Sequence, residues 1–228
     1  MDHKEYHLKS SDFLRDVVIG MSDGLTVPFA LAAGLSGAVS SNSIVITAGI
    51  AEIVAGSIAM GLGGYLAGKT EQEHYQSELQ KEYQEVAEIP EKELQEVKDI
   101  FADYGIDAAG QELIARALAK DKDRWVDFMM KFELGLEKPD INRARNAALT
   151  IGLAYIVGGL LPLSSYFVTD HPQEGLILSV VITTICLFVF GFFKSRITGQ
   201  PPLQGALKVT AIGLIAAAAA FGIAKMIG

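Results

Sequence analysis

Five apolar stretches, each near the length of a membrane-spanning helix, constrain the fold of this chain more than any other feature. They cover residues 17–39, 44–68, 147–168, 176–193 and 206–227. A helix rises about 1.5 Å per residue, so about 20 apolar residues cross the hydrocarbon core of a bilayer. Five helices that are apolar on every face would not fit in one small soluble domain. The sequence therefore predicts an all-α, polytopic membrane protein with five transmembrane helices.

The acidic residues are concentrated between the second and third apolar stretches. Residues 71–140 contain 19 of the chain's 27 Asp and Glu but only 9 of its 19 Lys and Arg. This predicts three parts: an N-terminal cytoplasmic segment with two spans (1–70), an acidic helical insert (71–140) and three further spans (141–228). Residues 71–88 contain no Gly or Pro, so we expect the second span to continue into the insert. Pro90 should then open a new helix.

Basic residues beside the spans predict the orientation of the chain. They are Lys4, Lys9, Arg15, Lys69, Arg143, Arg145, Lys194, Arg196 and Lys208. The loops near 40–43 and 169–175 carry none. The positive-inside rule then puts the N-terminus and the insert in the cytoplasm and the C-terminus on the opposite side. The first 13 residues show no apolar segment of the signal-peptide type. The negative insert would repel phosphate, which argues against nucleic acid as a partner.

Two carboxyl groups lie within the predicted spans, Asp23 and Glu52. An ionisable group at mid-bilayer costs at least about 2.5 kcal/mol, and such groups usually face a cavity or a partner. One interpretation is a protonated carboxyl bonded to a neighbouring helix. The other, which we favour, is a path for ions or protons. Asp16 lies seven residues before Asp23, on the same side of the helix and nearer the cytoplasm.

The first two spans should form a hairpin that turns near residues 41–42. In such an antiparallel pair Asp23 lies at the level of Met60. A carboxylate and a thioether at one depth suit a first-row metal better than an alkali ion. Packing explains Met60 equally well on its own. Glu52 lies about 12 Å from this level, toward the far face, where it would be the next stop for a cation or a group that exchanges protons.

Carboxylates of the insert recur at helical spacing. They are Glu78, Glu82 and Glu85 in one helix, Glu93 and Glu96 in the next, and Glu133, which follows Met129 and Met130 by four and three residues. Two helices that face each other with such pairs would form a carboxylate cage of the di-iron type. A solvated Glu/Lys helix face has the same spacing, and a buried core would also accept both methionines. Spacing alone leaves the choice open.

An enzyme is the main alternative class: a membrane-anchored ferroxidase or iron-binding protein that uses the acidic insert. Di-iron bundles usually contain two Glu-x-x-His pairs, and here only Glu71 and His74 have that spacing. A metal sensor without transport would leave Asp23 and Glu52 unexplained. One cysteine, Cys186, excludes an internal disulfide and a thiolate cluster.

Three segments carry a resemblance to a known family. SDGLTVPFALAAGLSG (22–37), AEIVAGSIAMGLGGYLAGKTE (51–71) and WVDFMMKFELGLEKP (125–139) resemble the vacuolar iron transporter family. The similarity extends over nearly the whole chain. The resemblance implies five transmembrane helices, a homodimer in a lipid membrane, and exchange of ferrous iron for protons along the dimer interface. It also implies a helical cytoplasmic metal-binding domain between the second and third spans.

The resemblance assigns roles to individual residues. The family's transport residues fall on Asp23, Glu52 and Met60. Its cytoplasmic metal ligands fall on Glu82, Glu85, Glu93, Glu96, Met129, Met130 and Glu133. The resemblance implies Fe²⁺ as cargo and no prosthetic group, and carboxylate with sulfur makes Mn²⁺, Co²⁺ and Zn²⁺ further candidates. We expect the vacuolar membrane in a eukaryote and the inner membrane in a prokaryote.

Overall fold

The computed structural model describes residues 12–227, which form helices joined by short loops and contain no strand. The elements are α1 (Asp12–Ala38), α2 (Asn42–Glu88), α3 (Pro90–Asp103), α4 (Ala108–Leu118), α5 (Lys122–Phe132), α6 (Arg143–Leu163), the 3₁₀ helix η1 (Ser164–Phe167), α7 (Pro172–Ile197) and α8 (Pro202–Ile227). Lys4 and Lys9, which contributed to the predicted orientation, lie outside the described residues.

Within residues 12–227, five helical segments are long and apolar enough to cross a membrane. They are α1, α2, α6 with η1, α7 and α8, and each contains one of the five apolar stretches. Large aliphatic side chains point outward on them; Ile58, Ile177 and Ile215 are 65%, 68% and 68% exposed. Such a surface suits lipid, where a helix satisfies its own backbone hydrogen bonds. The prediction of an all-α, polytopic membrane protein is confirmed.

Prolines mark several helix boundaries. α2 runs without a break over 47 residues, as the lack of a breaker in 71–88 predicted. Three helices begin with a proline: Pro90, Pro172 and Pro202. A backbone N–H at the first position of a helix has no intrahelical acceptor, so proline loses no hydrogen bond there. Asp107 and Asp121 then cap α4 and α5 by accepting hydrogen bonds from backbone N–H groups of the first turn.

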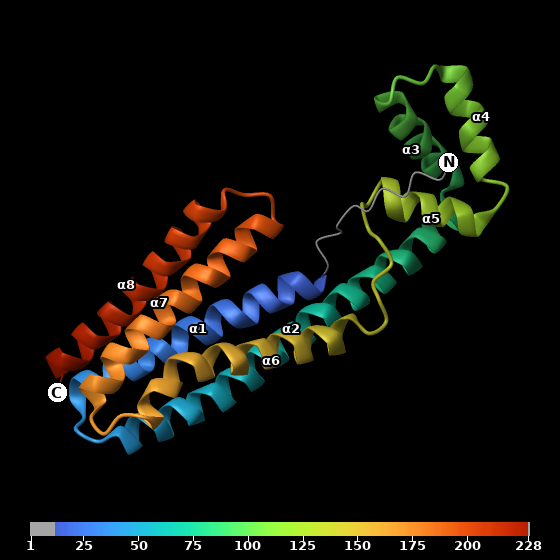
Figure 1. The fold of residues 1–228 in the computed structure, drawn as a ribbon. Coiled ribbons are helices and arrows are strands. Elements are labelled where there is room, and N and C mark those ends of the chain that lie inside the picture. Colours follow the sequence, from blue (N-terminus) through green and yellow to red (C-terminus); the bar gives the residue numbers. More distant parts are fainter. Residues whose placement is uncertain (1–11, 228) are drawn as a thin grey trace, which may run out of the picture. The chain divides into compact units, whose positions relative to one another are not determined.

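The chain divides into two compact units. The membrane unit extends to Leu66 and resumes at Ala144, and the insert unit is Ala67–Arg143. The chain passes from one unit to the other twice, once within α2 and once at the start of α6. In the membrane unit α8 lies beside α1 and α7 (Figure 1). The insert unit contains the second part of α2 together with α3, α4 and α5.

Glycines bring α1 and α6 into close contact. A Cβ added at Gly20 would lie 2.9 Å from the Cβ of Ala154, and one added at Gly158 would lie 2.9 Å from the backbone nitrogen of Leu25. Hydrophobicity does not drive helices together in lipid, so close backbone packing of this kind takes its place. The positions of Asp16 and Asp23 on α1 are therefore fixed against α6.

Substitution of Gly24 by valine should destabilise this contact. A Cβ at Gly24 would lie 2.9 Å from the Cα of Tyr155, and backbone cannot move aside as a flexible side chain can. We expect a loss of about 3 kcal/mol, at the upper end of overpacking costs, seen as a lower midpoint of thermal unfolding in detergent. Gly63→Val is the matched control, because nothing lies within 4 Å of a Cβ at Gly63. Equal midpoints for the two variants would contradict the prediction.

The insert unit has its own hydrophobic core. Its buried members are Tyr75, Val86, Val97, Ala115, Trp125, Val126, Met129 and Met130, which come from α2, α3, α4 and α5. α5 contributes four of these eight side chains. Because α5 is held by that core, the residue that follows it, Glu133, is held in place as well.

Candidate metal centre and ion path

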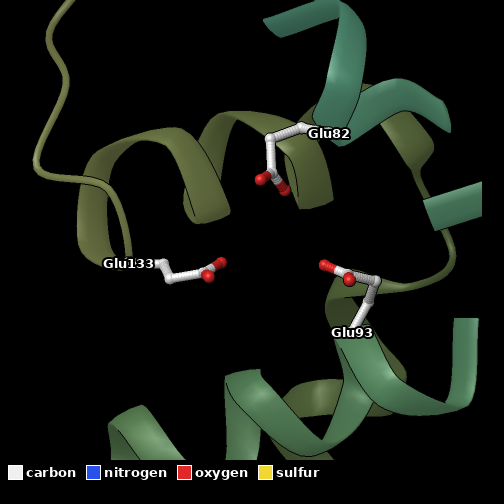
Figure 2. A group of neighbouring side chains, drawn as sticks. All are labelled: Glu82, Glu93 and Glu133. Carbon is white, nitrogen blue, oxygen red and sulfur yellow. The ribbon is translucent and has the colours of Figure 1, made fainter. Parts of the chain in front are cut away.

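Three carboxylates of the insert point toward one another (Figure 2). They belong to Glu82 of α2, Glu93 of α3 and Glu133, the C-cap residue of α5. One oxygen atom from each carboxylate lies within 4.8 Å of the others. We call this set the glutamate triad. Three carboxylate oxygens from three different helices are a ligand arrangement suited to a divalent cation.

Local sequence explains how the triad forms. Glu82 and Glu93 are separated by the break between α2 and α3, where Ile89 is non-helical and Pro90 starts the next helix. The chain reverses there, so α3 returns Glu93 toward Glu82. Glu93 also lies in the first turn of α3, where the helix dipole favours a negative charge.

Burial makes the triad electrostatically unfavourable without a cation. Glu82 and Glu93 are 2% and 1% exposed, and Glu82 Oε2 and both Glu93 oxygens have no hydrogen-bond partner among the described residues. Burial, together with the negative charges of neighbouring glutamates, raises the pKa of Glu82 to about 7 and that of Glu93 to about 7. Glu133 is exposed, but partial desolvation of its carboxylate also raises its pKa. Buried carboxylates normally find a partner, and a bound cation would supply one.

The other predicted ligands lie outside the triad. Glu85 and Glu96 are close enough for their charges to raise the pKa of Glu133, but each faces a lysine. Lys92 Nζ lies 2.8 Å from Glu96 Oε1, and Lys81 Nζ lies 3.9 Å from Glu85 Oε1. The structure thus separates the predicted carboxylates into three that converge and two that pair with lysines.

Met129 and Met130 lie in the hydrophobic core. Their side chains are 0% and 1% exposed and belong to the buried cluster of the insert. This is the packing role that the sequence left open for both. They come four and three residues before Glu133, the C-cap of the same short helix, so they also lie near the triad along the chain. That the sulfur atoms of Met129 and Met130 bind a metal ion stays a prediction.

Metal binding to the triad should depend on pH. Glu82 and Glu93 must be deprotonated to bind a cation, and their pKa values are both about 7. Between about pH 6 and pH 8 the affinity for Mn²⁺ should therefore rise, by up to about tenfold per pH unit for each proton displaced. Calorimetric titration of the full-length protein in detergent measures this. Equal affinity at both pH values would contradict it.

The predicted path residues all lie in the membrane unit. Asp16 and Asp23 are on α1, and Glu52 and Met60 are on the apolar part of α2. Asp16 is buried, at 2% exposed, and the other three are half-buried. Residues 16–68 contain no Lys, Arg or His. This part of α1 and α2 therefore contains no positively charged side chain that could neutralise Asp23 or Glu52.

Contacts with α6 show how α1 and α2 are aligned. The close contacts are Ile151 with Gly20 and Gly64, and Tyr155 with Gly24 and Gly56. Gly20 and Gly24 lie against the α6 backbone, whereas Gly64 and Gly56 are reached by the side-chain ends of Ile151 and Tyr155. Backbone contacts between α2 and α6 occur at Ser57 with Gly152 and at Gly61 with Ala148. That Asp23 and Met60 lie at one depth stays a prediction.

Tyr155 is a site residue that the sequence reasoning missed. It is 2% exposed, and its hydroxyl donates a hydrogen bond to Glu52 Oε1. Asp23 is also close enough to interact electrostatically with this tyrosine. One signal could have found it: a tyrosine within an apolar span must find a hydrogen-bond partner for its hydroxyl.

The fold and these sites define a polytopic helical membrane protein with intramembrane carboxylates and an acidic helical insert. The chain matches the VIT family over residues 14–225 and belongs to that family. It is 52% identical over 225 residues to vacuolar iron transporter 1 of Arabidopsis thaliana, which covers 99% of this chain and 90% of the relative. The corresponding protein of Tulipa gesneriana is 50% identical over 226 residues, with 99% and 92% covered.

A more distant relative is the protein named CCC1 of Saccharomyces cerevisiae. It is 36% identical over 223 residues, which are 94% of this chain and 69% of the relative. The plant relatives are named as transporters and not as enzymes. The ferroxidase alternative therefore has no support, and His74, which that alternative required, faces Glu78 rather than the triad.

Proposed function

We propose that this chain exports ferrous iron from the cytosol, into a vacuole or out of the cell, in exchange for protons. The observation that carries the proposal is its similarity, over almost its entire length, to plant proteins named vacuolar iron transporters. The insert and the membrane unit each contain carboxylates of the kind that this activity needs. A transporter must bind its cargo, desolvate it and release it, and the two sets of acids suit different parts of that task.

The glutamate triad is proposed as the site that captures Fe²⁺ in the cytoplasm. Two of its three carboxylates are buried and lack partners, so a divalent cation would offset their repulsion. Glu85, Glu96, Met129 and Met130 are proposed as additional ligands. The insert carries a net charge of −10 between residues 71 and 140, which would raise the local concentration of cations.

Asp23 and Met60 are proposed as the intramembrane ion site, with Asp16 on the cytoplasmic approach and Glu52 beyond it. A carboxylate with a thioether favours Fe²⁺ and similar first-row ions, including Mn²⁺, Co²⁺ and Zn²⁺, over Ca²⁺. Protonation and deprotonation of Asp23 and Glu52 would couple proton entry to metal exit, which is the usual use of intramembrane acids in transporters.

The proposed assembly is a homodimer with the N-terminus and the insert in the cytoplasm. The orientation follows from the basic residues beside the spans. An apolar groove between α1 and α8, lined in part by Ala30, Gly34, Ala216 and Ala220, supports helix packing between subunits. Small residues are those through which helices associate in lipid.

Reconstitution into proteoliposomes tests this function. Fe²⁺ supplied on the face that carries the insert should enter the vesicles when their lumen is acidic, and the lumen should lose protons as iron accumulates. Collapsing the pH gradient with a proton ionophore should stop net accumulation. A panel of Mn²⁺, Co²⁺, Zn²⁺ and Ca²⁺ as competitors gives the selectivity. Iron uptake that does not depend on the pH gradient would refute antiport but would still demonstrate iron transport.

A further inference from the structure

A buried tyrosine is bonded to one of the intramembrane carboxylates. Tyr155 lies near the middle of α6, and its hydroxyl donates a hydrogen bond to Oε1 of Glu52 on α2. The two residues are 103 positions apart in the chain. Glu52 Oε2 is buried too and has no hydrogen-bond partner among the described residues. The carboxylate therefore has one oxygen that is occupied and one that is free.

Gly56 makes room for this hydrogen bond. It lies one helical turn after Glu52, on the same face of α2. A Cβ at this position would overlap the phenol of Tyr155, lying 2.6 Å from its Cε1 atom. The tyrosine ring thus occupies space beside α2 that any side chain larger than that of glycine would fill. On its other side the backbone of Tyr155 lies against Gly24, where a Cβ would lie 2.9 Å from the Cα.

We infer that Tyr155 is a positioning residue that fixes the carboxylate of Glu52 and leaves Oε2 as the oxygen available to the cargo. The inference rests on the proposed function, in which Glu52 belongs to the ion path. A hydrogen bond to an ionised carboxylate is stronger than one between neutral groups and restricts its geometry. With Oε1 held by the phenol, Glu52 offers a single oxygen rather than a bidentate pair.

The position of Tyr155 supports a role beyond packing. Its ring reaches Glu52 of α2, its backbone touches Gly24 of α1, and Asp23 adjoins that glycine. The titratable groups near the phenol are Glu52 and Asp23, and residues 16–68 offer no basic side chain. Tyr155 therefore contacts both helices that carry the carboxylates proposed for transport.

Tyr166 supplies the comparison for a purely structural tyrosine. It is 1% exposed, lies on η1, and its hydroxyl shares a hydrogen bond of 2.9 Å with Ser36 Oγ. Both Tyr155→Phe and Tyr166→Phe remove one buried hydroxyl from the same membrane unit. Only the first removes a partner from an intramembrane acid.

The test measures Fe²⁺ uptake and the infrared carboxyl band of Glu52 in the full-length protein in proteoliposomes. In Tyr155→Phe we expect Vmax per folded protein to fall about tenfold, the cost of a hydrogen bond to a charged group. KM should change less than about twofold, because Asp23 and Met60 remain. The band that Glu52→Gln abolishes should shift in Tyr155→Phe and stay unchanged in Tyr166→Phe.

Each outcome has a distinct meaning. Uptake at the wild-type rate, or an unshifted band, in Tyr155→Phe overturns the inference even if Glu52→Gln abolishes transport. Wild-type uptake by Glu52→Gln refutes instead the proposed path through Glu52. If Tyr155→Phe does not fold, Glu52→Asp carries the test, because the shorter acid keeps its charge but withdraws from the phenol. It should lose about tenfold in Vmax, and wild-type uptake by that variant overturns the inference.

Discussion

Replacement of Asp23 by asparagine should lower Fe²⁺ uptake by about 100-fold or more. In the proposed path Asp23 provides a negative charge and Met60 provides a sulfur, and residues 16–68 hold no basic side chain. Loss of one charged partner from a low-dielectric site costs about 3 kcal/mol or more, which corresponds to about 100-fold in rate. The initial rate of uptake into proteoliposomes with an acidic lumen measures the effect. Metal binding by the insert should be unchanged, because Asp23 belongs to the other unit.

Thr26→Val is the matched control for this substitution. Thr26 lies three residues further along α1, and its hydroxyl donates only to the backbone oxygen of Ser22 within the same helix, at 2.8 Å. Uptake by Thr26→Val should equal that of the wild type. Asp23→Asn and Asp23→Ala both transporting Fe²⁺ like the wild type would remove Asp23 from the path. The same result with Met60→Ala would remove the whole intramembrane site.

The spans and the continuation of α2 were predictable because they depend on local properties. Apolar length identifies a membrane helix, and the absence of Gly and Pro in 71–88 allows α2 to run on into the insert. The neighbours of each span were not predictable. α7 and α8 are apolar on nearly every face, so their sequences do not say which of their faces meet. That choice depends on close fit at glycines such as Gly205 and Gly213, whose added Cβ atoms would overlap Ser195 and Leu187.

The glutamate triad was only partly predictable. Helical spacing puts Glu82 and Glu85 near one another, but it cannot say which of them faces inward. The core built around Trp125 decides that, leaving Glu82 buried and Glu85 beside Lys81. The role of Tyr155 was not predictable from the sequence for a related reason. Its partner Glu52 is on a different helix, and only the tertiary fold brings the two together.

Substitution of both Glu82 and Glu93 by glutamine should have two opposite effects. Metal affinity at about pH 8 should fall by about 100-fold or more, since even indirect supports of a ligand are worth 10 to about 100-fold. The metal-free insert should at the same time become more stable at that pH. Glutamine keeps the shape of the side chain but removes two buried charges that repel each other and Glu133.

The sign of the stability effect follows from the pKa values. The pKa values of Glu82 and Glu93 are raised to about 7 in the folded protein from 4.5. Between these values the folded state binds more protons than the unfolded chain, so its stability falls as pH rises through that range. Near pH 4.5 both carboxyls are protonated in the fold, and the advantage of the glutamine variant should disappear.

Glu91→Gln is the matched control, because Glu91 is exposed and lies in the same first turn of α3 as Glu93. It should change neither Mn²⁺ affinity, measured by calorimetry, nor the midpoint of thermal unfolding of the full-length protein in detergent. A structural role for the triad predicts the reverse of our expectation, namely a double variant that is less stable at every pH. A more stable protein that no longer binds metal means instead that the fold keeps these carboxylates together at a cost that only a cation offsets.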